Sequence, residues 1–218
     1  MVLSLLLTLA CGAAQTPATR GGWLSAPDQV ARGVEFFTST ETSLLDPAGP
    51  ISISLLRLDP AHVRLSSLLS NDEVMYAEPV LEMATRAKVV AAVNAGFFNI
   101  NNGEPIGLLK VAGELVSDTP IAKGAVAVWS PADGRTTLAF DQVSARVELH
   151  LVSGGQPVVI PIDGVDTTRA RGKLMLYSPK YHANTDTAVN GVEWVLSGQP
   201  LAVVSIRRDL GSTPIPAD

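Results

Sequence analysis

The chain is poor in the residues that build metal and redox sites. Its 218 residues include one cysteine, Cys11, and three histidines that are scattered along the sequence. A zinc site needs several ligands at suitable spacing, and a disulfide needs two cysteines. We therefore expect no metal site, no disulfide and no cofactor. The P-loop, H-E-x-x-H, G-x-S-x-G and G-x-G-x-x-G motifs are also absent, so none of these familiar catalytic signatures assigns an activity.

Charged residues are scarce as well, and no run of lysine or arginine occurs. Charged residues make up 17% of the chain, and the formal net charge is −5. Proteins that bind nucleic acids or anionic membranes carry basic patches that face the phosphates. We therefore expect no nucleic-acid partner and no membrane contact beyond a lipid anchor at Cys11. The apolar share of 46%, with 18 glycines and 15 prolines, indicates a globular, turn-rich protein.

The N-terminus carries an apolar run that is too short to cross a bilayer, which takes about 20 residues. Small residues follow it, and Gly12 and Ala14 stand at the −3 and −1 positions before Gln15. This pattern predicts a secretory signal peptide over residues 1–14. A lipoprotein signal ending before Cys11 is the alternative. Both interpretations place the protein outside the cytoplasm, whether secreted, periplasmic or lipid-anchored.

Residues 15–30 are rich in Pro, Gly, Thr and Ser without a sustained period, which predicts a linker or irregular arm. The remaining length, residues 31–218, suits one domain. Apolar residues at i, i+3, i+4 and i+7 predict a helix over residues 79–86. The apolar run that follows, residues 89–93, predicts a strand buried on both faces.

Most of the chain after this run has a strand pattern. Turn residues at Ala112-Gly113 and at 131–134 separate apolar runs, and both places predict hairpins. Further short apolar runs follow from residue 145 to the end of the chain. With one helix and many strands, the pattern predicts an α+β domain that is mostly antiparallel.

Four carboxylates lie in the predicted loops and are candidates for catalysis: Glu104, Asp118, Asp163 and Asp166. Glycoside hydrolysis uses two carboxyl groups, one as an acid and one as a base or nucleophile. The sequence alone leaves open which of them meet in space. The catalytic residues are therefore unassigned at this level.

The loop Asn-Ala-Gly-Phe-Phe combines polar, flexible and aromatic residues after the predicted buried strand. The Asn94 amide can bind a ligand or loop backbone, and Gly96 lets a ligand approach the backbone closely. Adjacent side chains of an extended chain point to opposite sides. One of Phe97 and Phe98 could therefore enter the core while the other lines a cavity and faces a sugar ring. The alternative is that both rings are core residues that hold the loop in place.

Four consecutive segments carry a family resemblance: the helix EPVLEMATRAK, the strand VVAAV, the NAGFF loop and the hairpin PIGLLKVAGELVS. Together they resemble the phosphodiester glycosidase family, that of the N-acetylglucosamine-1-phosphodiester α-N-acetylglucosaminidase-like proteins. The resemblance is most specific over residues 79–127. It implies hydrolysis of the bond between a sugar's anomeric carbon and a phosphodiester, with a carbohydrate or glycosyl phosphate as substrate. An extracytoplasmic binding module that keeps the pocket without catalysis is the alternative. The substrate-binding residues that the resemblance implies are Asn94, Gly96, Phe97, Phe98, Pro105 and Gly107.

Two signatures of this family are absent from the chain. It contains neither a Gly-Gly-Gly stretch nor an Asp-Gly-Gly-Gly-Ser segment, and it ends at Asp218 where family members continue. Residues 31–218 therefore resemble the N-terminal part of a family domain, truncated at its C-terminus. From the resemblance we expect an incomplete domain whose activity is reduced or lost.

Overall fold

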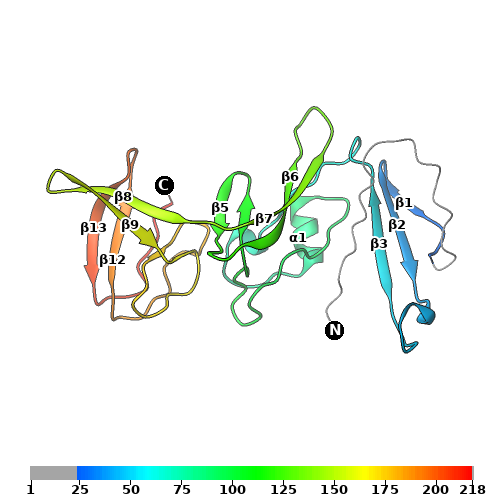
Figure 1. The fold of residues 1–218 in the computed structure, drawn as a ribbon, viewed down its shortest axis with the longest axis horizontal. Helices are drawn as coiled ribbons and strands as arrows, with labels where there is room; N and C mark the ends of the chain where they lie inside the picture. Colours follow the sequence, from blue (N-terminus) through cyan, green and yellow to red (C-terminus); the bar gives the residue numbers. More distant parts are fainter. Residues whose placement is uncertain (1–23, 218) are drawn as a thin grey trace. The chain divides into compact units, whose positions relative to one another are not determined.

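The computed structural model describes residues 24–217 (Figure 1). The predicted signal peptide, Cys11 and the first part of the predicted arm lie outside these residues. The chain forms two compact units, of which the first ends at Val63 and the second begins at Arg64. The single domain that the sequence predicts over residues 31–218 therefore includes the boundary between these two units.

The first unit is a three-stranded antiparallel sheet in the order β1–β2–β3. Its strands are β1 (Asp28–Ala31), β2 (Val34–Ser39) and β3 (Ile53–Leu58), and the 3-10 helix η1 (Thr42–Leu44) follows β2. Val34, Phe37 and Ser39 of β2 are buried. Because side chains alternate along a strand, Phe37 and Ser39 lie on one face and Val34 lies on the other. The β1–β2 turn contains Gly33 at φ +77°, where an added Cβ would lie 2.7 Å from the Cβ of His62. This close approach requires glycine.

The second unit contains helix α1 (Val80–Ala87), so the predicted helix over residues 79–86 is confirmed. Pro79 stands at its N-cap, and Lys88 ends it in the left-handed conformation. Arg86 pairs with Glu78 at 2.8 Å and with Asp72 at 2.6 Å. Within residues 24–217, no helix has the length and apolar content needed to cross a membrane.

The rest of the second unit is built from two-stranded sheets and the 3-10 helix η2 (Ser70–Asp72). Both predicted hairpins are confirmed, and Ala112 and Gly113 have the positive φ values, 51° and 91°, that a tight hairpin turn needs. The antiparallel pairs are β4 (Leu109–Val111) with β5 (Glu114–Ser117), β6 (Lys123–Trp129) with β7 (Thr137–Val143), β8 (Val147–Ser153) with β9 (Gln156–Ile162), and β12 (Val192–Ser197) with β13 (Ala202–Arg208). The parallel pair is β10 (Gly164–Val165) with β11 (Met175–Leu176).

The predicted α+β class is wrong. Strands account for 37% of residues and helices for 7%, so the protein is nearly all-β. The prediction gave weight to one helix and to a buried strand directly after it, but the helix has only eight residues. No strand forms at residues 89–93, and Val90 is 65% exposed. A strand needs a neighbour to accept and donate backbone hydrogen bonds. Among the described residues, none pairs with this run, and apolar character alone did not create a strand.

The core of the second unit is small and joins distant parts of the chain. Leu69, Val74, Met75, Val116 and Tyr181 form its buried cluster. The backbone N–H of Val74 donates to the carbonyl of Lys180 at 2.7 Å, and that of Met75 donates to Tyr181 at 3.2 Å. These bonds hold the segment before α1 against the segment after β11. Because Val116 lies in β5, the same core also fixes the strand that leads into the site described below.

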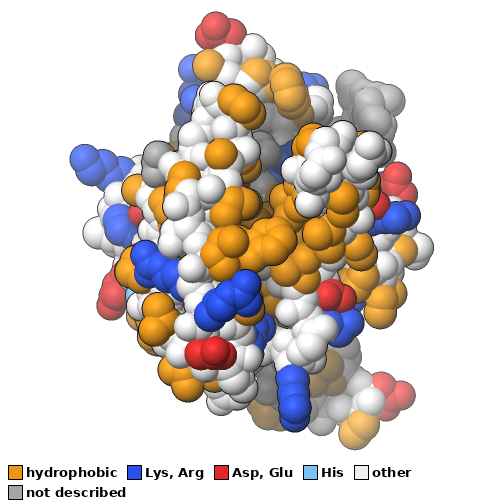
Figure 2. All heavy atoms as spheres, turned by 90° about the vertical axis from the view of Figure 1, so that its left-hand side faces the viewer, with side chains coloured by type: hydrophobic (Ala, Val, Ile, Leu, Met, Phe, Trp, Pro, Cys, Tyr) orange, Lys and Arg blue, Asp and Glu red, His pale blue; other side chains and the backbone are white. Residues whose placement is uncertain are grey.

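Many apolar side chains remain outside this core. Apolar side chains gather on the face shown in Figure 2, at the end of the second unit that carries β12 and β13. Trp194 and Ile206, which face each other across this hairpin, are 47% and 53% exposed. Isolated two-stranded sheets bury little apolar area, since one hairpin cannot cover both of its own faces.

Candidate functional site

The predicted NAGFF loop continues into a short hairpin whose tip is residues 99–104. Phe98 and Pro105 form an antiparallel bridge, and the N–H of Ile106 donates to the carbonyl of Phe97 at 2.8 Å. At the tip, Gly103 has φ +87°, and an added Cβ would lie 2.6 Å from the backbone of Tyr76. Only glycine allows this approach. The loop is therefore held by its own hydrogen bonds and by contact with the segment before α1.

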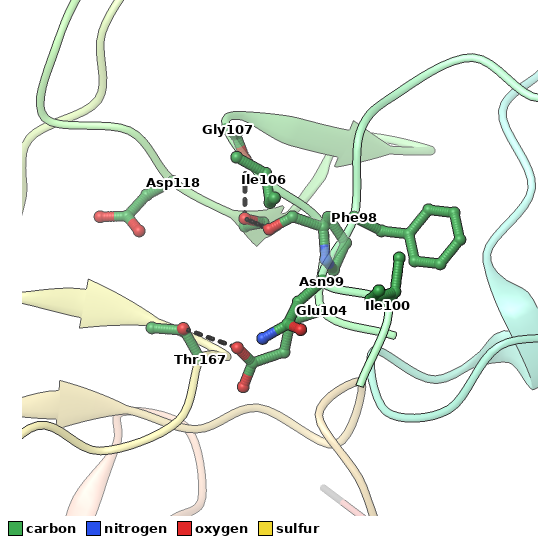
Figure 3. Close-up of a pocket in the computed structure, with 10 residues that line it drawn as sticks. Phe98, Asn99, Ile100, Glu104, Ile106, Gly107, Asp118 and Thr167 are labelled. Atoms are coloured by element: carbon green, nitrogen blue, oxygen red, sulfur yellow. Dashed lines mark hydrogen bonds between the residues drawn. The ribbon is translucent and has the colours of Figure 1, made fainter. Parts of the chain in front are cut away.

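A cavity of about 540 Å³ opens beside this hairpin (Figure 3). This volume lies within the range of roughly 300–1,000 Å³ that is typical of small-molecule sites. Figure 3 shows Phe98 and Ile100 on one side and Asp118 on the other, with Glu104 joined to Thr167 by a hydrogen bond. The lining residues are Phe98, Asn99, Ile100, Glu104, Pro105, Ile106, Gly107, Ser117, Asp118 and Thr167.

The structure divides the six residues that the family resemblance implied. Phe98, Pro105 and Gly107 line the cavity. Asn94, Gly96 and Phe97 do not line it, and all three are exposed.

Neither phenylalanine is a core residue, so the prediction that one ring enters the core is wrong, and so is the alternative that both do. Phe97 is 70% exposed and Phe98 is 45% exposed. Phe98 therefore has ring surface available to a ligand, which a core residue would lack.

Glu104 is the most buried carboxylate of the cavity wall, with 8% exposure. The N–H and hydroxyl of Thr168 each donate to its Oε1 at 2.5 Å, and the hydroxyl of Thr167 donates to Oε2 at 3.3 Å. Both carboxylate oxygens are thus engaged by neutral donors. Glu104 joins the hairpin tip to a loop more than 60 residues further along the chain.

Asp118 directly follows β5 and lines the cavity on the side opposite Phe98. The N–H of Val165 in β10 donates to its Oδ1 at 3.3 Å. Within the described part of the chain, its Oδ2 has no hydrogen-bond partner. The neighbouring Ser117 is 5% exposed and donates to the carbonyl of Gly107 at 2.7 Å, which joins two walls of the cavity.

The other two candidate carboxylates do not line the cavity. Asp163 pairs with Lys173 at 2.9 Å, and its pKa is lowered mainly by the hydrogen bond from the backbone of Leu174. Asp166 is 1% exposed, and Ser178 donates to it from both N–H and hydroxyl at 2.6 Å. Burial raises the pKa of Asp166 to about 6. Asp163 and Asp166 therefore hold loops together in this structure.

Several lining residues had no signal in the sequence. Ser117 lies in β5 and Thr167 lies in the loop after β10, so contacts between distant segments bring them to the same cavity. Asn99 and Ile100 follow the NAGFF motif directly, and the extent of the loop could have suggested them. Among residues 24–217, no group of three or more His, Cys, Asp or Glu side chains could hold a metal ion.

No family model and no curated protein matches the chain. A similar solved structure is the crystal structure of a hypothetical protein from Synechocystis, with a TM-score of 0.66 and 19% sequence identity. The likeness shows the fold alone. The matched region covers 88% of this chain and 35% of the Synechocystis chain, so the protein spans about a third of the length of that structure. The resemblance to phosphodiester glycosidases stays a prediction.

Proposed function

We propose that the protein is an exported hydrolase of the phosphodiester glycosidase type, which releases a sugar from a sugar-1-phosphodiester. The observation that carries this proposal is the cavity lined by the partly exposed Phe98 on one side and by Asp118 on the other, with Glu104 in the wall. Aromatic rings suit the apolar faces of sugars, and carboxylates are the usual catalytic groups for glycosidic bonds. The NAGFF motif and its position before the hairpin support the same activity.

The charge around the cavity suits a substrate with a neutral and an anionic part. Lys123 at the start of β6 passes beside Gly107, since a Cβ added there would lie 3.8 Å from the Cδ of Lys123. The sugar would lie against Phe98 and the carboxylates, and the phosphodiester would lie toward this ammonium group. A phosphomonoester ionises fully near neutral pH, with a second pKa near 6. It therefore leaves without strong help from a general acid.

A binding module without catalysis is the second candidate function. The observation that favours it is that Glu104 accepts three hydrogen bonds. These bonds give its carboxylate a structural role in place of a catalytic one. Such a protein would bind a glycan or glycosyl phosphate in the same cavity without cleaving it.

The experiment that separates these functions uses the purified protein and the methyl phosphodiester of α-N-acetylglucosamine 1-phosphate. Calorimetry measures binding, and ³¹P and ¹H NMR measure the release of methyl phosphate and free sugar. Binding with release above the rate in buffer supports the hydrolase. Binding without release supports the binding module, and the absence of both overturns the two proposals.

Phe98→Ala tests whether this cavity is the binding site. A ring that contacts an aromatic or sugar face contributes about 0.5–1.5 kcal/mol beyond its buried area, so we expect affinity to fall by at least about 2- to 12-fold. Phe140→Ala is the matched control, because Phe140 is 59% exposed on β7 and does not line the cavity. Equal losses of affinity in the two variants would contradict the assignment of the site.

A further inference from the structure

The two carboxylates of the cavity differ in how many of their lone pairs are already used. A carboxylate offers about four acceptor positions. Glu104 accepts three hydrogen bonds, two of them at 2.5 Å. Asp118 accepts one long bond of 3.3 Å from Val165. A general base needs an oxygen that can approach the proton it removes to about 2.6–3.2 Å between heavy atoms, and Asp118 offers this more readily.

The surroundings of Asp118 also suit a group that must hold its position. It follows Val116 and Ser117, which are 0% and 5% exposed at the end of β5. The donor to its Oδ1 is the backbone of Val165, which is 3% exposed in β10. Catalytic groups supported by packed strands keep their geometry better than groups on free loops. One oxygen of Asp118 is thus held by the scaffold while the other remains available.

We propose that Asp118 is the general base of the site and that Glu104 is a positioning residue. This inference rests on the proposed function. Asp118 takes a proton from a water molecule, and the water oxygen forms a bond to the anomeric carbon. The bond between that carbon and the phosphate oxygen breaks, and its electron pair remains on the departing phosphomonoester. The proton on Asp118 then passes to solvent, so one water molecule is added across the bond.

The proposed step also sets the stereochemistry of the product. A single displacement by water inverts the anomeric carbon, whereas attack by a carboxylate followed by water retains its configuration. An α-linked phosphodiester should therefore first release the β-anomer of the sugar. Glu104 acts differently, since it holds Thr167 and Thr168 at the cavity wall and does not touch the reacting atoms.

The test compares Asp118→Asn, Glu104→Gln and the control Asp141→Asn, a change to an exposed carboxylate of β7 outside the cavity. The substrate is again the methyl phosphodiester of α-N-acetylglucosamine 1-phosphate. General-base catalysis is typically worth about 10²- to 10⁴-fold, so we expect D118N to lower kcat by at least 100-fold with Kd changed less than 3-fold. D118N should also lose the acidic limb of the pH–rate profile. E104Q should keep that limb, and D141N should match the unchanged protein.

Two further measurements guard against a folding defect. Circular dichroism and urea unfolding should show the same fold in D118N, because Asn can still accept from Val165. Added formate should restore part of the activity of Asp118→Ala, since it can occupy the vacated space as a base.

The outcomes that overturn the inference are distinct from those that overturn the function. A wild-type protein that releases sugar while D118N keeps its kcat refutes the role of Asp118 alone. Release of the α-anomer as first product refutes the general-base step alone. Binding without release in the wild-type protein refutes the hydrolase proposal and the role of Asp118 together.

Discussion

Asp166→Asn should remove a pH dependence from the stability of the second unit. The Asp166 carboxyl is 1% exposed, and burial raises its pKa from 3.8 to about 6. Each pKa unit corresponds to about 1.4 kcal/mol, so a shift of about 2 units corresponds to roughly 3 kcal/mol. Because the folded state binds this proton more tightly than the unfolded state, the contribution favours folding below pH 4. It is lost progressively as the pH rises from about 4 through 6.

The asparagine variant is neutral at every pH and keeps the acceptor for the Ser178 N–H. Its own amide N–H can donate to the Ser178 hydroxyl, which at present donates to the carboxylate. The altered bonding should cost about 1 kcal/mol at all pH values. Relative to the wild-type protein, Asp166→Asn should therefore gain about 2.5 kcal/mol in the free energy of unfolding between pH 4 and pH 7. The decisive result is the direction of the change: the stability of Asp166→Asn relative to wild type should increase with pH.

Urea unfolding at pH 4, 5, 6 and 7, followed by circular dichroism, measures this difference. Asp141→Asn on the exposed surface of β7 is the control, and its stability relative to wild type should vary little with pH. A difference between Asp166→Asn and wild type that stays constant within about 1 kcal/mol over this range would refute the argument. A difference that falls with pH would show that the buried carboxylate is stabilised in its charged form.

Two further changes test how the cavity wall is held. Gly103→Ala should lower the free energy of unfolding by at least about 2 kcal/mol, since its Cβ would lie 2.6 Å from the Tyr76 backbone at a positive φ. Gly113→Ala is the control, because it has φ +91° with no atom within 4 Å; equal losses in urea unfolding would rule out the role of the close contact. Thr168→Val should cost about 1.5–3 kcal/mol by removing a hydroxyl donor to the Glu104 carboxylate. A double-mutant cycle with Glu104→Gln should show coupling above 0.5 kcal/mol, and strict additivity would contradict a direct bond.

Local features could be predicted from the sequence because their causes are local. The periodic apolar residues of α1 and the Pro79 before it lie within one short segment. The Ala112-Gly113 turn likewise depends on the conformations of two adjacent residues. Such local patterns favour the same conformation whatever the fold of the rest of the chain. The bounds of the helix and the positions of both hairpin turns were therefore predicted close to those observed.

The wrong predictions concern features that need a distant partner. The run at residues 89–93 has the composition of a buried strand, but no described segment pairs with it. The motif residues Asn94 and Phe97 are close in sequence to Phe98, which lines the cavity, yet they do not line it themselves. Phe97 and Phe98 are adjacent in an extended segment, where neighbouring side chains point to opposite sides, and only Phe98 lines the cavity.

By itself, the sequence determined the helix and the two hairpins, since short-range conformational preferences suffice for these. Phe98, Pro105 and Gly107 were named together only through the family resemblance, and the structure places all three on the cavity wall. The tertiary structure alone decided which carboxylates share the cavity. It placed Thr168 on Glu104 and the Val165 N–H on Asp118, across 64 and 47 residues of chain. It also buried Asp166, which changed the pKa of that group. Hydrogen-bond partners and burial come from segments far apart in sequence, and the chemistry of each carboxylate depends on them.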